Sequence, residues 1–186
     1  MKDFFNSSEV RQDENAKSLS YFCTKGLVMI NNQIIHQLIE ESEKNNSSDI
    51  RLSLHKDPSD KHHNMIILQH KGNYYRPHKH LAKPETYHLI KGKMAVFIFD
   101  DTGAIIDSSI LDPQENIIYR IGANNWHVSI PLTEHVIFNE SKPGPFIRQG
   151  DSIFAEWAPD GSNNEETANH LSKLLQTLNL EDINNG

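Results

Sequence analysis

The chain has 186 residues, 37% of them hydrophobic, which is enough for one domain with a sizeable core. Its net charge is −7 and its lysines and arginines form no cluster, so nucleic acid is not expected as a partner. The single cysteine, Cys23, excludes an internal disulfide, and no apolar run approaches the roughly 20 residues of a membrane-spanning helix. The acidic N-terminus lacks a signal-peptide core, and we therefore expect a cytoplasmic protein with no membrane contact.

The first fifty residues predict an arm, a short strand and a helix. Residues 1–20 are polar and predict a flexible N-terminal arm, and the apolar residues 27–30 predict a strand. Asn31 or Asn32 is a good helix cap, and one apolar stripe follows it: Ile34, Ile35, Leu38 and Ile39. The helix is expected to end near residues 45–48, a plain polar linker.

From Arg51 onward the apolar period changes from that of a helix to two, which is typical of β-strands. The segment Asp100–Gly103 predicts a tight hairpin, because glycine tolerates the positive φ that such turns require. Short strands at this spacing favour a sandwich or barrel. The predicted strands are 50–55, 64–70, 73–80, 85–91, 94–100, 104–111, 116–121, 126–130, 135–140 and 146–155.

The C-terminal region predicts a second helix. Asn163 and Glu166 form a helix start close to the capping-box pattern. The apolar side chains that follow lie on one helical face, which is expected to pack on the outside of the barrel or on a second subunit: Leu171, Leu174, Leu175 and Leu178. The predicted organisation is a barrel with its preceding helix over residues 21–160 and a helix and tail over 161–186.

Two histidines and a glutamate lie within eight residues. His78 and His80 are separated by one residue, so in a strand both imidazoles point to the same side. Residues 81–84 predict a tight connection, and an antiparallel return would bring the Glu85 carboxylate beside the imidazoles. His127, on a distant predicted strand, is the candidate for a third imidazole. Three nitrogens and one oxygen suit one divalent transition metal ion, Fe, Mn, Ni, Co or Zn.

This spacing resembles a known pattern. Counted from Gly72 to Gly92, the two histidines and the glutamate match the first metal motif of the cupins at each fixed position. Longer segments, between about Arg51 and Pro159, resemble the WbuC family of cupin-fold metalloproteins: YRPHKH, FDDTG, the Trp126-His127 pair, GPF and FAEWAP. Pro131 departs from the general cupin motif, which has asparagine there.

The resemblance implies a mainly β, single-domain cupin fold, a double-stranded β-helix or jelly-roll barrel, with one helix before it and one after. It also implies one metal ion, held by His78, His80, Glu85 and His127. Because cupins often pair through edge strands, a homodimer is expected.

Further candidates follow from strand parity. Arg76 shares a face with His78 if the strand is regular, and its guanidinium would bind a substrate carboxylate or phosphate; a rim ion pair is the alternative. Tyr87 is a candidate proton donor or a core tyrosine. Glu140 is a candidate general acid or base, its pKa raised by an apolar interior, or a surface residue. Trp126 is expected to pack over the metal ligand His127 and is a candidate substrate-binding residue.

These features allow three functional hypotheses with a small-molecule ligand. The first is a metal-dependent isomerase or epimerase acting on a small polar substrate, such as a sugar derivative in surface-polysaccharide synthesis, which the WbuC resemblance suggests. The second is an Fe(II)-dependent dioxygenase, and the third is a non-catalytic binding protein in which the metal fixes one ligand. The fold alone does not separate them.

Overall fold

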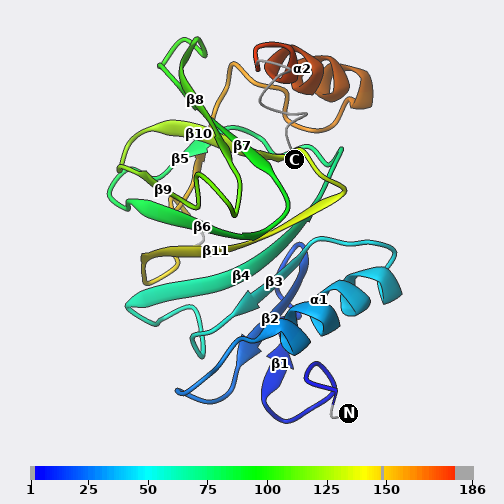
Figure 1. Ribbon diagram of the computed structural model, residues 1–186. Helices are drawn as coiled ribbons and strands as arrows, with labels where there is room; N and C mark the ends of the chain where they lie inside the picture. The colour runs from blue at the N-terminus through cyan, green and yellow to red at the C-terminus, as the bar shows by residue number, and fades with distance from the viewer. Residues whose placement is uncertain (1–2, 148, 179–186) are drawn as a thin grey trace.

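The computed structural model describes residues 3–147 and 149–178 and contains two β-sheets and two helices (Figure 1). Sheet A has the strand order β1-β2-β3-β4-β11-β6-β9. Its strands are β1 (Val10–Gln12), β2 (Leu19–Cys23), β3 (Ile50–Ser53), β4 (His62–His70), β11 (His135–Pro143), β6 (Glu85–Lys91) and β9 (Ile118–Ile121). Sheet B has the order β12-β5-β10-β7-β8, with β12 (Ile153–Phe154), β5 (His78–Lys79), β10 (Trp126–Pro131), β7 (Met94–Phe99) and β8 (Ile105–Leu111).

Eight of these strands have the topology of a double-stranded β-helix. From β4 to β11 the chain passes to the other sheet at each step except β7 to β8, a hairpin within sheet B. The first and last of the eight, β4 and β11, pair antiparallel along their full length. This strand order is the jelly roll of the cupin type, so the predicted mainly β fold with one helix at each end is confirmed.

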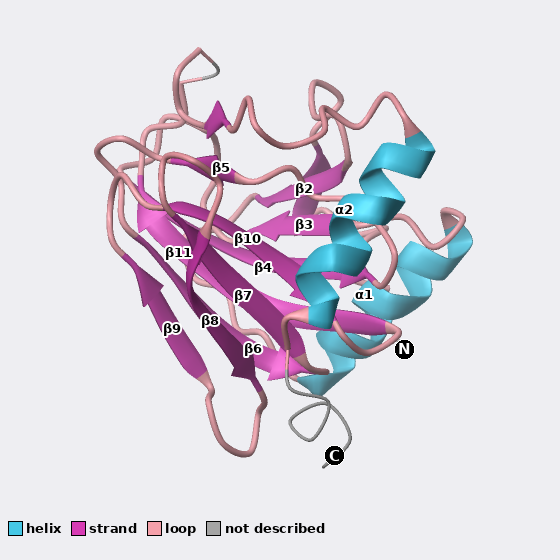
Figure 2. Cartoon of the chain, turned by 90° about the horizontal axis from the view of Figure 1, so that it is seen from above, coloured by secondary structure: helices cyan, strands magenta, loops and turns pink. Residues whose placement is uncertain are grey.

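The hydrophobic residues form three clusters that correspond to three layers of packing. The middle cluster lies between the sheets and includes Leu89 from sheet A and Val96 from sheet B. The outer face of sheet A is covered by α1 (Asn32–Lys44), whose Leu38 is fully buried. The outer face of sheet B is covered by α2 (Asn164–Gln176) through Leu174 and other leucines, and both helices lie outside the sheets (Figures 1 and 2).

The two helix starts agree with the sequence. The Asn31 side chain accepts a hydrogen bond from the Ile34 N–H at 3.1 Å, and the Asn163 side chain accepts from two N–H groups of the first turn of α2. The apolar stripe of α2 packs on the outside of the jelly roll, as expected. Within the described residues, no helix is long and apolar enough to cross a membrane.

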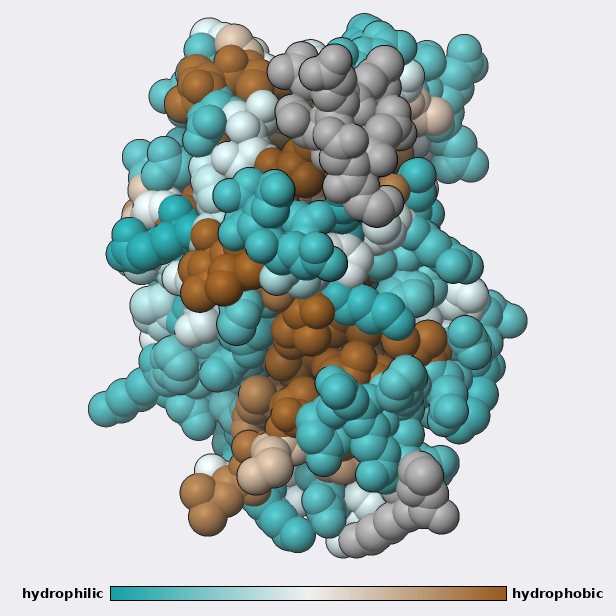
Figure 3. Space-filling model, viewed as in Figure 1, coloured by the Kyte–Doolittle hydropathy of each residue, from teal (hydrophilic) through white to brown (hydrophobic). Residues whose placement is uncertain are grey.

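The N-terminal region differs from the prediction. Residues 10–12 and 19–23, expected as a flexible arm up to residue 20, extend sheet A as β1 and β2, and Phe5 is buried. Strand β2 runs parallel to β3, with α1 as the crossover between them, a non-local pairing that periodicity does not reveal. The expected strand at 27–30 is a loop in which Leu27 is 94% exposed, and apolar atoms project at the lower left of Figure 3, where Figure 1 draws this loop.

Two other predicted strands are much shorter than expected. Segment 73–80 is a strand only at β5, and 146–155 is a strand only at β12. Pro77 cannot donate a hydrogen bond, and proline also restricts the residue before it, so the ladder begins after it. Its carbonyl accepts from the Ala155 N–H at 2.9 Å instead.

A buried histidine pair predicts acid sensitivity. The rings of His55 and His63 stack at 4.2 Å, and burial, with a smaller contribution from His63, lowers the pKa of His55 from 6.5 to about 4. Between these values the unfolded chain binds a proton that the folded chain does not, so stability present above 6.5 is lost as the pH falls to 4. The loss from His55 is at most about 3 kcal/mol.

Urea unfolding with a chelator present, at neutral pH and at about pH 5, measures this loss. We expect His55→Gln to be less sensitive to pH than the wild type. An equal loss in both proteins would contradict the assignment to His55.

Candidate metal centre

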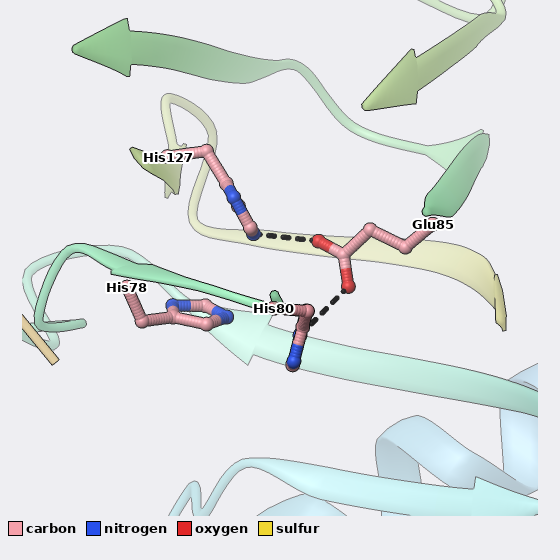
Figure 4. A group of neighbouring side chains, drawn as sticks. All are labelled: His78, His80, Glu85 and His127. Atoms are coloured by element: carbon pink, nitrogen blue, oxygen red, sulfur yellow. Dashed lines mark ion pairs between the residues drawn. The ribbon is translucent and has the colours of Figure 1, made fainter. Parts of the chain in front are cut away.

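Three imidazoles and one carboxylate converge inside the jelly roll (Figure 4). One ligand atom each from His78, His80, Glu85 and His127 lies within 4.8 Å of the other three. Glu85 lies between two of the imidazoles: its Oε1 is 2.7 Å from His127 Nε2, and its Oε2 is 3.2 Å from His80 Nε2. All four side chains are buried or half-buried, so the four residues predicted from the sequence do form one cluster.

The two sheets position these residues in a way that corrects one expectation. His78 lies on β5, directly opposite His127 on the antiparallel strand β10 of sheet B. Glu85 begins β6, which belongs to sheet A. The chain therefore crosses between the sheets at residues 81–84 and does not return antiparallel to β5. The carboxylate meets the imidazoles across the interior.

Each imidazole is oriented by a backbone carbonyl at its Nδ1 atom. His78 bonds the Arg76 carbonyl at 3.4 Å, and His127 bonds the Asn125 carbonyl at 2.9 Å. His80 bonds the Asp151 carbonyl at 2.5 Å. A hydrogen bond at Nδ1 fixes the tautomer with the Nε2 lone pair free, as in many metal sites of proteins.

The Nε2 atoms of two of these histidines are free to bind a metal ion. Within the described residues, the buried Nε2 atoms of His80 and His127 have no hydrogen-bond partner. They lie at ion-pair distance from Glu85, but the geometry does not suit a hydrogen bond. A buried polar atom left in this way requires an explanation, and an ion bound by the protein is one. The donor set and these free atoms fit a transition metal ion, whose identity the residues do not decide.

The electrostatics of the cluster agree with metal binding. Burial, followed by the neighbouring His127, lowers the pKa of His78 to about 3, so this imidazole is neutral near pH 7. Burial raises the pKa of Glu85, but the imidazoles of His127 and His80 outweigh it, and the net pKa lies well below the ordinary value. Burial lowers the pKa of His80, but Glu85 outweighs burial and the net direction is upward.

Metal content is expected to fall on acidification, because protons compete for the imidazoles. His80, with its raised pKa, takes up a proton first, whereas His78 stays neutral to about pH 3. Affinity is therefore full above the raised pKa of His80 and declines as the pH falls through and below it. Dialysis at stepped pH with elemental analysis measures this decline, and a content that stays flat to about pH 4 would contradict ligation by histidine.

A polar network surrounds the Glu85 carboxylate. The Tyr87 hydroxyl donates to Glu85 Oε1 at 2.5 Å, and burial raises the Tyr87 pKa well above 10, so the group remains a phenol. Lys142 Nζ lies 3.9 Å from Glu85 Oε2 and 2.8 Å from Glu140 Oε1. Glu140 lies opposite Tyr87 in the register of β11 and β6. Glu140 thus faces inward beside an ammonium group, not in the apolar setting that we expected.

Sequence reasoning did not find Lys142, although its spacing contains the signal. It stands two residues after Glu140 on β11, so both side chains point to the same side of the strand. Lys83 was also missed: it donates to the Asp151 carboxylate and to the Pro145 carbonyl. Because Asp151 accepts from His80, Lys83 holds the segment that orients this imidazole.

The structure places Arg76 away from the imidazole cluster. Its Nε and Nη2 atoms donate to the Ala155 carbonyl at 3.0 and 2.7 Å. Its side chain lines a groove of about 690 Å³ beside α2, together with Trp157, Glu166 and Lys173. The expected shared face with His78 is wrong because residues 74–77 are not a strand, so strand parity does not apply. Substrate binding by Arg76 stays a prediction.

Trp126 also lies elsewhere than expected. It precedes His127 on β10, so the two side chains point to opposite faces of sheet B. Its Nε1 donates to Asp101 Oδ1 at 2.8 Å, Lys79 Nζ lies 4.4 Å from its ring centroid, and the ring packs on the outer cluster. Its placement over the metal ligands is therefore wrong.

Fold and site together define a cupin-type jelly roll with a candidate metal centre of three histidines and one glutamate. A family model described as a domain of unknown function, DUF6016, matches residues 30–111. A comparison with curated proteins found no significant match.

Several solved structures are similar. The capsular polysaccharide assembling protein CapF from Staphylococcus aureus has 16% identity and a TM-score of 0.49, over 59% of this chain and 32% of CapF. An L-ribose isomerase from Cellulomonas parahominis has 13% identity and a TM-score of 0.49, over 64% of this chain and 72% of the isomerase. A protein from Klebsiella pneumoniae with a double-stranded β-helix domain has 16% identity and a TM-score of 0.45, over 58% of this chain and 80% of the Klebsiella protein. This chain thus spans about a third of CapF, and similarities this weak assign no function to it.

Proposed function

We propose that this protein is a metal-dependent enzyme of the isomerase or epimerase type that acts on a small polar substrate, a sugar or sugar derivative. The observation that carries the proposal is the convergence of three oriented imidazoles and Glu85 within 4.8 Å. Four protein ligands leave two positions of an octahedral ion for a substrate, which a closed structural site does not. The carbohydrate class and a place in surface-polysaccharide synthesis rest on the resemblance to the WbuC family.

The roles of the residues follow from their contacts. A bound divalent ion would polarise a carbonyl or hydroxyl of the substrate. Glu140 is the proposed proton carrier, because its buried carboxylate lies near the ligands without being one of them. Tyr87, the other candidate, donates a hydrogen bond to Glu85, so its proposed role is to fix this ligand.

A dioxygenase is the second candidate, because the donor set, with imidazoles and a carboxylate and without thiolate, also suits Fe(II). In that case the two open positions would hold substrate and oxygen. A binding protein without catalysis is the third outcome that an experiment has to separate.

The test begins with elemental analysis of protein purified without an affinity tag. Reloaded protein is then incubated with aldoses, ketoses, their phosphates and sugar acids in D₂O, and NMR follows interconversion and deuterium uptake next to the carbonyl carbon. We expect wild-type protein to exchange this hydrogen, and Glu140→Gln to lose at least about 100-fold of the rate with its metal retained. Iron with oxygen uptake would support the dioxygenase, and tight binding without turnover would support the binding protein.

A further inference from the structure

The position of Lys142 is the starting point. This lysine lies on β11 with its side chain 14% exposed, between the Glu140 carboxylate at 2.8 Å and the metal ligand Glu85 at 3.9 Å. Within the described residues these two carboxylates are its ionic partners. Glu85 is too distant to accept a hydrogen bond, so the ammonium has N–H groups left over for another acceptor.

A buried lysine is costly unless its charge is compensated. Lys142 has this compensation, since its ammonium lies 2.8 Å from the Glu140 carboxylate and 3.9 Å from that of Glu85. An ion pair with Glu140 alone would contribute little to stability in such a place. The burial of this lysine is therefore better explained by the total charge of the metal centre, which includes Glu85, Glu140 and the bound ion.

The charges of the centre can be counted. In formal charges, Glu85 and Glu140 count as −1 each, Lys142 counts as +1, and coordinating imidazoles count as neutral. Lys83 and Asp151 form a neutral pair beside the centre. The chain thus supplies a net charge of −1, which a divalent ion converts to +1. Without the Lys142 ammonium the loaded centre would be neutral.

We propose, on the basis of the proposed metal-dependent function, that Lys142 selects a monoanionic ligand, a carboxylate, for the metal-loaded centre. A carboxylate neutralises the excess positive charge and can accept an N–H of the ammonium while it binds the metal. Charge-assisted hydrogen bonds of this kind are stronger than neutral ones. The substrate class is then an acid, such as a sugar acid or another hydroxy acid, and not a neutral sugar.

The experiment uses the full chain loaded with Co²⁺, whose visible absorption reports ligands at the metal. The probes are acetate and the neutral acetamide, which has nearly the same shape. Wild-type protein is expected to bind acetate more tightly than acetamide. In Lys142→Met, acetate binding weakens by about 10- to 100-fold, because one charge at this range is lost, while acetamide binding stays unchanged. Lys142→Arg, which keeps the charge, retains most of the acetate affinity.

Lys93→Met is the matched control. Lys93 is 13% exposed and forms an ion pair with Asp112 at 3.3 Å, so its environment resembles that of Lys142 without the metal ligands. We expect its acetate affinity to equal that of the wild type. If Lys142→Met does not fold, Glu140→Gln decides, since it raises the net charge and should tighten acetate binding.

Equal acetate affinities in wild type, Lys142→Met and Glu140→Gln would overturn the inference, and so would a loaded wild type that binds no acetate. Cobalt content measured in the same samples distinguishes a failure of the proposed role of Lys142 from a failure of the proposed metal centre. Normal cobalt content with unchanged acetate affinity rejects only the role of Lys142. Absence of cobalt from the wild type rejects the metal centre itself.

Discussion

Replacing His80 by alanine is expected to remove most of the bound metal while the protein keeps its β-sheet spectrum. The imidazole is 2% exposed, its Nδ1 bonds a carbonyl, and its Nε2 faces the other ligands. Loss of a residue that only orients a ligand usually costs 10- to 100-fold in metal affinity, so loss of a ligand should cost at least about 100-fold. Elemental analysis and circular dichroism on the same sample measure both effects.

His88→Ala is the matched control for this variant. His88 is an exposed histidine on β6, with parity opposite to that of Glu85, so its removal should leave the metal content unchanged. Full metal occupancy in both His78→Ala and His80→Ala would show that the assigned site is wrong. A His80→Ala protein that has lost its β-sheet spectrum would show that this residue is needed for folding, and His127→Ala would then take its place in the test.

Replacing Leu174 by alanine is expected to lower the stability of the protein strongly while its metal content stays unchanged. This side chain is 7% exposed and packs, in one cluster with Phe97 and Val128, on the outer face of sheet B. Truncating a buried leucine costs about 2–5 kcal/mol, which in a chain of this size lowers Tm by roughly 5–15 °C. The ligands lie on the inner side of the sheet, so metal content should stay near that of the wild type. Thermal unfolding and elemental analysis measure the two quantities.

The neighbouring Lys173→Ala serves as control, because Lys173 is exposed on the same helix and its removal should change stability by less than about 0.5 kcal/mol. A Leu174→Ala protein of normal stability would show that α2 does not cover sheet B in solution. Loss of metal from a variant that is still folded would show that α2 supports the site, against the separation of inner and outer faces described above.

The four candidate ligands could be found from the sequence because their positions follow local rules. Two histidines with one residue between them share a side of any strand, and the spacing from them to Glu85 matches the first cupin metal motif. His127 followed from the resemblance to the WbuC family. The strand boundaries from 85 to 140 were also close, because alternating apolar residues record which face is buried. Both helix starts were visible in their asparagine caps.

Strand parity does not predict side-chain direction where the backbone leaves the strand conformation. Arg76 was assigned to the side of His78, but proline at position 77 shortens the strand, and the guanidinium binds the Ala155 carbonyl. Trp126 was predicted to pack over His127, its neighbour in sequence, although adjacent residues in a strand point to opposite faces. Lys142 was missed because the parity that it shares with Glu140 gives the side of the strand but does not show that this side is buried against the metal ligands.

The sequence by itself determined the mainly β class, the helix caps and three candidate ligands, since each depends on residues close in the chain or on a fixed spacing. The jelly-roll type and the fourth ligand, His127, came from the resemblance to cupins. The tertiary structure alone decided that β5 and β6 lie in different sheets, that β2 pairs parallel with β3, and that Lys142, Glu140 and Tyr87 surround Glu85. The physical reason is that sheet pairing and the burial of charge depend on contacts between segments that are distant in the chain. The free energy of these contacts is distributed over the whole core, so the periodicity of a single segment does not reveal them.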